Sequence, residues 1–162
     1  MEKRNATADV LISYMLNAPR ELVFKAWTDP VHLPKWYAPR GCSVFFKELD
    51  IRVNGSFLCC IHNPEYGDCW SRGMYHEIVV PEKLVYSLVI ANELGQPVNP
   101  VDVGMDADWP AETLVTVTFA DLGNKTKITL HQTVAESIAR RTGAHPSWIQ
   151  MFERFEEQLQ NL

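Results

Sequence analysis

The chain has 162 residues, of which 46% are hydrophobic, and a formal net charge of −5 from 15 basic and 20 acidic residues. This length suits one ordinary domain with a sizeable core and leaves no room for a second domain. Because the balance is acidic and no basic run is longer than Arg140-Arg141, we expect no nucleic-acid partner.

The chain also lacks the signals of membrane insertion and export. No apolar run approaches the roughly 18 residues that a spanning helix needs. The start, Met-Glu-Lys-Arg-Asn, leads into an alternating strand rather than into the apolar segment of a signal peptide. We therefore expect a cytoplasmic protein with no membrane span.

The predicted elements begin with a strand over residues 10–16, where apolar positions alternate. Two helices within residues 19–36 follow it directly. Pro19 suits the first helical position, where the missing N–H costs nothing. Asp29-Pro30 restarts the pattern, and Pro34 limits the second helix to a short stretch or one 3₁₀ turn.

Strands alone are predicted for the next part of the chain, each bounded by a turn signal such as Asn54-Gly55 or Pro81-Glu82. The predicted ranges are 42–49, 55–63, 68–80, 83–91, 112–120 and 125–133. Because consecutive hairpins need no long crossover, these strands are expected to form an antiparallel meander.

The end of the chain has helical periodicity. Residues 135–142 predict a short helix that ends at Thr142-Gly143, and a long amphipathic helix opens on Trp148 with Pro146 in its first turn. The sheet and this helix must bury their apolar faces against each other. This predicts a two-layer α+β domain over residues 1–162.

Several short motifs follow one another along nearly the whole chain. They are Ala18-Pro19, Val23-Phe24, Asp29-Pro30, Trp36 before Pro39, Asp50-Ile-Arg52, Asn54-Gly55, Gly73-Met-Tyr-His-Glu77, Pro81-Glu-Lys-Leu84-Val-Tyr86 and Trp148 at the start of the last helix. Their order resembles the START-like (SRPBCC) superfamily, in the branch similar to the C-terminal domain of the activator of the ninety-kilodalton heat-shock protein's ATPase. Two positions depart from that pattern: Asn54 replaces the first glycine of a usual pair, and Ser147 replaces the glycine before the helix tryptophan.

The resemblance implies a helix-grip fold. In this fold a curved antiparallel sheet, here of about seven strands, grips the long C-terminal helix, and two short helices follow the first strand. The resemblance also implies a cavity between the sheet and the C-terminal helix.

The residues predicted to face that space are mostly apolar or aromatic, as in pockets for small apolar ligands, although a filled core has the same composition. The predicted ligand-binding residues are Phe57, Cys59, Ile61, Tyr75, Tyr86, Leu88, Val117, Phe119, Trp148, Phe152 and Phe155. Tyr75, Tyr86, Thr126 and Gln132 are candidate polar groups for orienting a ligand, and a buried tyrosine bonded to the main chain is the alternative.

The connection over residues 92–111 is long for a compact domain, and such loops are often functional. We interpret it as a lid over one mouth of the cavity, with Met105 and Trp109 as its apolar contacts; a solvated excursion is the alternative. Glu77 is the best candidate for acid–base chemistry, because simple alternation places it on the same face as Tyr75. A salt-linked role for Glu77 is the other interpretation.

The sequence supports no metal or cofactor. Its five histidines are scattered over different elements, and it has no His-Glu-x-x-His, P-loop, dinucleotide fingerprint or Gly-x-Ser-x-Gly elbow. The cysteines, Cys42, Cys59, Cys60 and Cys69, contain no Cys-x-x-Cys pair, and we interpret them as reduced structural thiols. Cys60 and Cys69 are expected to lie nearest to solvent.

Three functions remain in competition. The first is a binding module, more a carrier than an enzyme, that holds a small, mostly apolar ligand such as a lipid or polyketide between the sheet and the C-terminal helix. The second is an enzyme of the polyketide cyclase/dehydratase type, implied by the resemblance, that would use acid–base catalysis in the same cavity. A co-chaperone that stimulates a heat-shock ATPase ranks last, because that activity relies on a separate domain. The sequence leaves open the ligand's identity and the choice between monomer and homodimer.

Overall fold

One curved antiparallel sheet of seven strands dominates the computed structural model, which describes residues 8–162. The prediction that Met1–Asn5 does not begin a signal peptide concerns residues outside the described range. The strands are β1 (Asp9–Leu16), β2 (Ser43–Leu49), β3 (Ser56–Asn63), β4 (Gly67–Val79), β5 (Lys83–Ala91), β6 (Glu112–Asp121) and β7 (Thr126–Ala135). Their order across the sheet is β1-β7-β6-β5-β4-β3-β2, which confirms the predicted meander of antiparallel strands.

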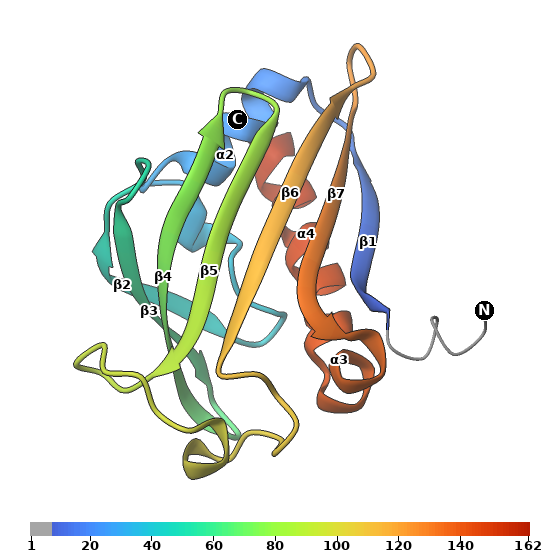
Figure 1. Cartoon of the computed structure of the whole chain (residues 1–162). Helices are drawn as coiled ribbons and strands as arrows, with labels where there is room; N and C mark the ends of the chain where they lie inside the picture. Colours follow the sequence, from blue (N-terminus) through green and yellow to red (C-terminus); the bar gives the residue numbers. More distant parts are fainter. Residues whose placement is uncertain (1–7) are drawn as a thin grey trace.

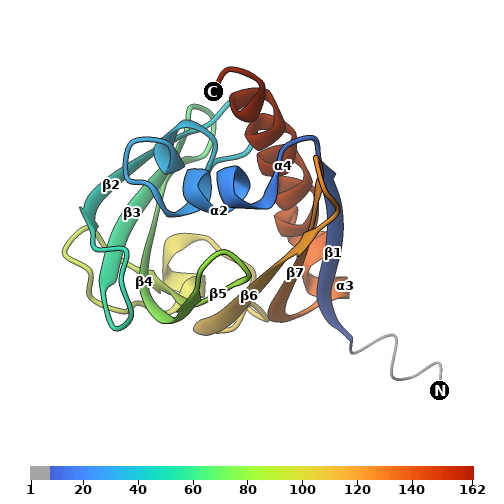
Figure 2. The same cartoon turned by 90° about the horizontal axis from the view of Figure 1, so that it is seen from above.

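The helices occupy the concave side and the two ends of this sheet (Figure 1). They are α2 (Arg20–Thr28), the 3₁₀ turns η1 (Leu33–Lys35) and η2 (Pro100–Val103), the short α3 (Glu136–Thr142) and the long α4 (Ala144–Gln160). Seen from above, the sheet curves from β2 round to β1, and α4 and α2 lie across its open side (Figure 2). This arrangement confirms the predicted helix-grip fold.

Helix α4 begins at Ala144, four residues before the predicted start. Gly143, at a left-handed φ of 87°, ends α3 and immediately precedes α4, so no loop separates the two helices. Pro146 is then the third helical residue. Its missing N–H costs nothing there, because the first four N–H groups of a helix have no partner within the helix.

A β-bulge in β4 corrects the prediction for Glu77. The pairing between β4 and β5 shifts between Tyr75 and Glu77, so that both Tyr75 and Ile78 face the core. Glu77 is therefore exposed on the opposite face from Tyr75, where its carboxylate lies 3.5 Å from Lys83 Nζ. Simple alternation failed here because the bulge adds one residue to the strand.

The interior is densely filled at the end that α2 covers. The Trp36 ring stacks on Phe155 with centroids 4.0 Å apart and planes 6° from parallel. Trp27 packs edge-on against Trp36 at 4.8 Å and against Phe119 at 5.9 Å. All four side chains are fully buried or nearly so, and each such aromatic group contributes strongly to the stability of the core.

Candidate functional site

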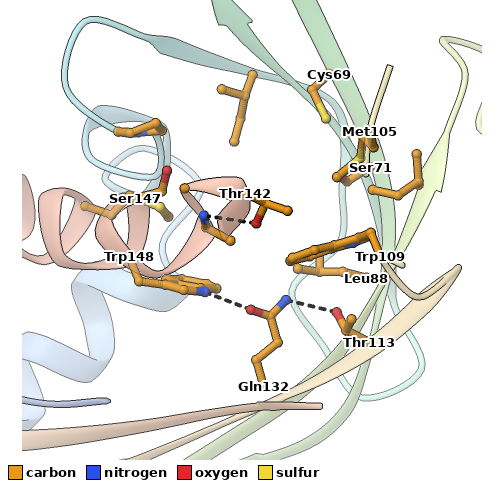
Figure 3. Close-up of a pocket in the computed structure, with 16 residues that line it drawn as sticks. Cys69, Ser71, Leu88, Met105, Trp109, Thr113, Gln132, Thr142, Ser147 and Trp148 are labelled. Carbon is orange, nitrogen blue, oxygen red and sulfur yellow. Dashed lines mark hydrogen bonds between the residues drawn. The ribbon is translucent and has the colours of Figure 1, made fainter. Parts of the chain in front are cut away.

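A pocket of about 280 Å³ lies between the sheet and the start of α4, away from the aromatic cluster around α2. Side chains from strands, from α3 and α4, and from the 92–111 connection surround it (Figure 3). The lining residues are Pro39, Ile61, Cys69, Ser71, Leu88, Ile90, Met105, Trp109, Thr113, Gln132, Thr142, Gly143, Ala144, Ser147, Trp148 and Met151. None of them is an aspartate, glutamate, lysine, arginine or histidine, so the lining suits an uncharged apolar molecule.

A chain of hydrogen bonds crosses one wall of the pocket. Gln132 Oε1 accepts a bond of 2.9 Å from the Trp148 indole N–H, and Gln132 Nε2 donates a bond of 3.0 Å to Thr113 Oγ1. The Gln132 amide lies between the indoles of Trp148 and Trp109 in Figure 3. An amide carries two N–H donors, and the bond to Thr113 uses one of them.

The 92–111 connection covers one side of the pocket with Met105 and Trp109. Arg141 of α3 fixes this segment: its Nε and Nη2 donate to both carboxylate oxygens of Asp106 at 3.0 and 2.9 Å, and Nη2 also reaches Asp108 at 3.1 Å. The paired guanidinium lowers the pKa of the Asp106 carboxyl from its ordinary value. The segment that contacts the pocket is thus held to α3 by a bidentate ion pair.

A wider, more polar chamber of about 670 Å³ adjoins the pocket. The two spaces share Pro39, Ile61, Cys69, Met105 and Thr142 as lining residues. The side chains of this outer chamber include the carboxylates Asp68 and Glu93 and no lysine, arginine or histidine. His62 Nδ1 lies 2.6 Å from the Asp68 carboxylate, and Lys47 Nζ donates to the Glu93 carbonyl at 2.9 Å.

The predicted ligand-binding residues divide into three groups. Ile61, Leu88 and Trp148 line the 280 Å³ pocket. Phe57, Tyr75 and Tyr86 border a separate void of about 10 Å³, which is at the lower limit for one water molecule. The remaining five lie in the packed core and do not line either space: Cys59, Val117, Phe119, Phe152 and Phe155.

Three of the four candidate polar groups lie outside the pocket. The hydroxyl of Tyr86 is hydrogen-bonded to that of Tyr37 at 2.7 Å, and burial raises the pKa of both phenols well above the ordinary value. Burial likewise raises the pKa of the Tyr75 phenol. Thr126 donates to the Ala18 carbonyl at 2.8 Å and so ties β7 to the start of α2. Gln132 is the candidate that reaches the pocket.

The cysteines are all free thiols. Burial raises the pKa of Cys59 to about 12, and burial also raises the pKa values of Cys60 and Cys69. Cys69 is exposed as a residue, as expected, although its thiol lies at the wall of the pocket and is partly shielded from water there. Cys60 lies on the outer face of the sheet but is buried, contrary to the prediction, because its neighbours across the two adjacent strands are the large side chains of Phe45 and Trp70.

Sequence reasoning did not place nine of the lining residues: Pro39, Ser71, Ile90, Thr113, Thr142, Gly143, Ala144, Ser147 and Met151. Ile90 continues the alternation of Tyr86 and Leu88, so extending that pattern to the end of β5 would have found it. Pro39 has no such signal. Arg154 of α4 holds its segment through bonds to the carbonyls of Ala38 and Pro39 at 2.6 and 3.2 Å, a contact between residues far apart in sequence.

Residues 8–162 contain no group of three or more histidine, cysteine, aspartate or glutamate side chains placed to hold a metal ion. Among the helices in this range, none is both long and apolar enough to cross a membrane.

The fold and the pocket beside its long helix define a START-like protein of the helix-grip class. Residues 17–160 match the family model described as Activator of Hsp90 ATPase homolog 1-like protein, and the chain belongs to this family. A search of curated proteins found no match.

Solved structures share the fold over nearly the whole chain. A protein from Arthrobacter aurescens aligns with a TM-score of 0.82 at 20% identity, over 98% of this chain and 89% of that one. A protein from Chromobacterium violaceum aligns with a TM-score of 0.75 at 24% identity, over 93% and 95%. The AHSA1 protein from Silicibacter pomeroyi aligns with a TM-score of 0.73 at 15% identity, over 94% and 97%. At these identities the likeness establishes the fold alone.

Proposed function

We propose that this protein binds a small, mostly apolar molecule in the 280 Å³ pocket between the sheet and the start of α4. The observation that carries the proposal is a hollow, uncharged lining at one end of an otherwise filled interior. Ile61, Leu88 and Trp148 supply apolar contact, and Trp109 covers the opposite side. Such pockets bury most of a small ligand's surface and use few polar groups to orient it.

Acid–base catalysis has less support from the same geometry. Cys69 is the only lining side chain with an ordinary titratable group, and burial raises its pKa, which keeps the thiol protonated at neutral pH. Glu77, the carboxylate considered for this role, lies exposed on the other face of the sheet. The proposed role is therefore binding rather than turnover.

Butylbenzene is a suitable first probe, because it is uncharged and of a size that the pocket can hold. A ligand that favours the folded state must stabilise it, by about 2.7 kcal/mol at a concentration of 100 times the dissociation constant. We expect butylbenzene to raise the melting temperature and to slow alkylation of Cys69. Cys42, which lies outside the inner pocket, serves as the internal control.

Native mass spectrometry of freshly purified protein adds a test for a ligand retained from the cell. Retained molecules would appear as a discrete added mass that is lost on denaturation. Butylbenzene that changes neither the melting temperature nor Cys69 alkylation at its solubility limit would count against the proposal. Equal protection of Cys42 and Cys69 would point to binding in the outer chamber instead.

A further inference from the structure

Two polar side chains in the lining of the 280 Å³ pocket are buried, Gln132 and Thr113, and they are hydrogen-bonded to each other. Gln132 is 3% exposed, and its amide is held at both ends, by the Trp148 indole and by the Thr113 hydroxyl. These two bonds fix the orientation of the amide, with the oxygen toward Trp148 and the nitrogen toward Thr113. The second N–H of Gln132 Nε2 is not used by either bond.

We propose that the pocket selects an uncharged ligand with one oxygen acceptor, a ketone or an ester, whose oxygen receives a hydrogen bond from this N–H of Gln132. The inference rests on the proposed function and specifies the ligand that the same pocket takes. A preorganised donor inside an apolar lining favours the ligand that satisfies it, because an unpaired buried donor costs free energy.

The lining of the pocket disfavours an anionic ligand. A carboxylate ligand would lose its hydration in a pocket whose lining has no lysine, arginine or histidine. The adjoining outer chamber adds the carboxylates Asp68 and Glu93 to the lining and no lysine, arginine or histidine. A fatty-acid type of ligand is therefore disfavoured in the pocket.

The volume sets the ligand's size. An apolar cavity of about 150 Å³ holds benzene, which has six non-hydrogen atoms, so about 280 Å³ corresponds to about eleven. Butylbenzene, benzylacetone and phenylbutyrate share a phenyl ring and a four-carbon chain of this size. They differ in their polar group: butylbenzene has none, benzylacetone has a ketone, and phenylbutyrate has a carboxylate.

The test compares the dissociation constants of these three compounds in the native protein and in the Gln132→Met variant, by calorimetry. Methionine keeps the length of the side chain and removes the amide. We expect the variant to bind benzylacetone about three- to tenfold more weakly, the effect of one hydrogen bond, and to bind butylbenzene no more weakly. Phenylbutyrate should bind neither protein measurably.

Gln160→Met is the matched control, because it makes the same substitution at an exposed position of α4 that does not line the pocket. Benzylacetone affinity should be unchanged in this variant. If Gln132→Met does not fold, the infrared carbonyl band of bound benzylacetone in the native protein replaces it. That band should lie at a lower frequency than in hexane.

The outcomes separate the two proposals. Equal loss of butylbenzene and benzylacetone affinity in Gln132→Met, an unshifted carbonyl band, or tighter binding of phenylbutyrate would each overturn the selection of an uncharged acceptor while leaving an apolar pocket in place. Failure of all three compounds to bind the native protein would overturn the proposed function and this inference together.

Discussion

Filling the pocket with a protein side chain tests directly whether the space is hollow. Ser147 lies on α4 and lines the pocket, and serine and phenylalanine have similar helix propensities. The phenyl ring of Ser147→Phe would take about 150 Å³, roughly half of the pocket's volume. Burying a phenylalanine side chain contributes about 1.5–3 kcal/mol relative to leaving it exposed, and part of this is offset by lost rotamer freedom. We expect the free energy of unfolding to stay the same or rise by up to about 2 kcal/mol.

The matched variant is Val23→Phe, which adds a ring at a fully buried position of α2 in the filled half. Overpacking there should cost about 1–3 kcal/mol. Urea unfolding followed by tryptophan fluorescence measures both variants, and butylbenzene should no longer stabilise Ser147→Phe. A loss of stability in Ser147→Phe as large as that in Val23→Phe would refute the reasoning, because it would mean that the space is filled in solution.

Three further predictions follow from the same contacts. Arg141→Gln should speed amide hydrogen exchange across residues 105–109 and speed ligand release. The free energy of unfolding should change little, because the ion pair of Arg141 is half-exposed. Arg140→Gln, the control, should speed neither process. Cys59 should resist iodoacetamide at pH 8 until the protein is unfolded, because burial raises its pKa to about 12; peptide mass spectrometry reports this. In urea unfolding, Leu84→Ala in the packed core should cost about 3–5 kcal/mol, and Leu88→Ala, which borders space already hollow, about 1–2.

The architecture was predictable from the sequence because it depends on local patterns. Alternation and turn residues placed every strand within two residues of its observed ends. Pro34 predicted a short helix or one 3₁₀ turn, and the structure has a 3₁₀ turn at Leu33–Lys35. Asn54 illustrates how a departure from the family pattern can be tolerated. It adopts a left-handed φ of 69°. Glycine adopts this conformation most readily, and asparagine is enriched in it among the other residues.

Errors arose where one residue changes the expected orientation or position of the residues that follow it. The bulge in β4 reversed the sheet faces expected for the residues after Tyr75. No glycine lies between Tyr75 and Glu77 to indicate a bulge. The helix start at Ala144 was missed because Pro146 is compatible with several positions in the first turn. Contacts such as that between Arg141 and Asp106 join residues 35 apart in the sequence, so no local pattern could predict them.

Composition could not distinguish a hollow interior from a filled one. The order of side-chain sizes along α4 does so once the packing of this helix against the sheet is known. The first turn of this helix presents Ala144 and Ser147 toward the sheet, and Ser71 faces them from β4. Two turns later the same helix presents Phe152 and Phe155, which meet the tryptophans of α2 and its following turn. These small side chains leave between larger neighbours a gap that aromatic rings fill further along the helix, so the pocket lies at the α3 end. Residues that widen the gap there, and the Gln132 amide within it, are therefore better guides to the ligand than the aromatic residues that stabilise the fold.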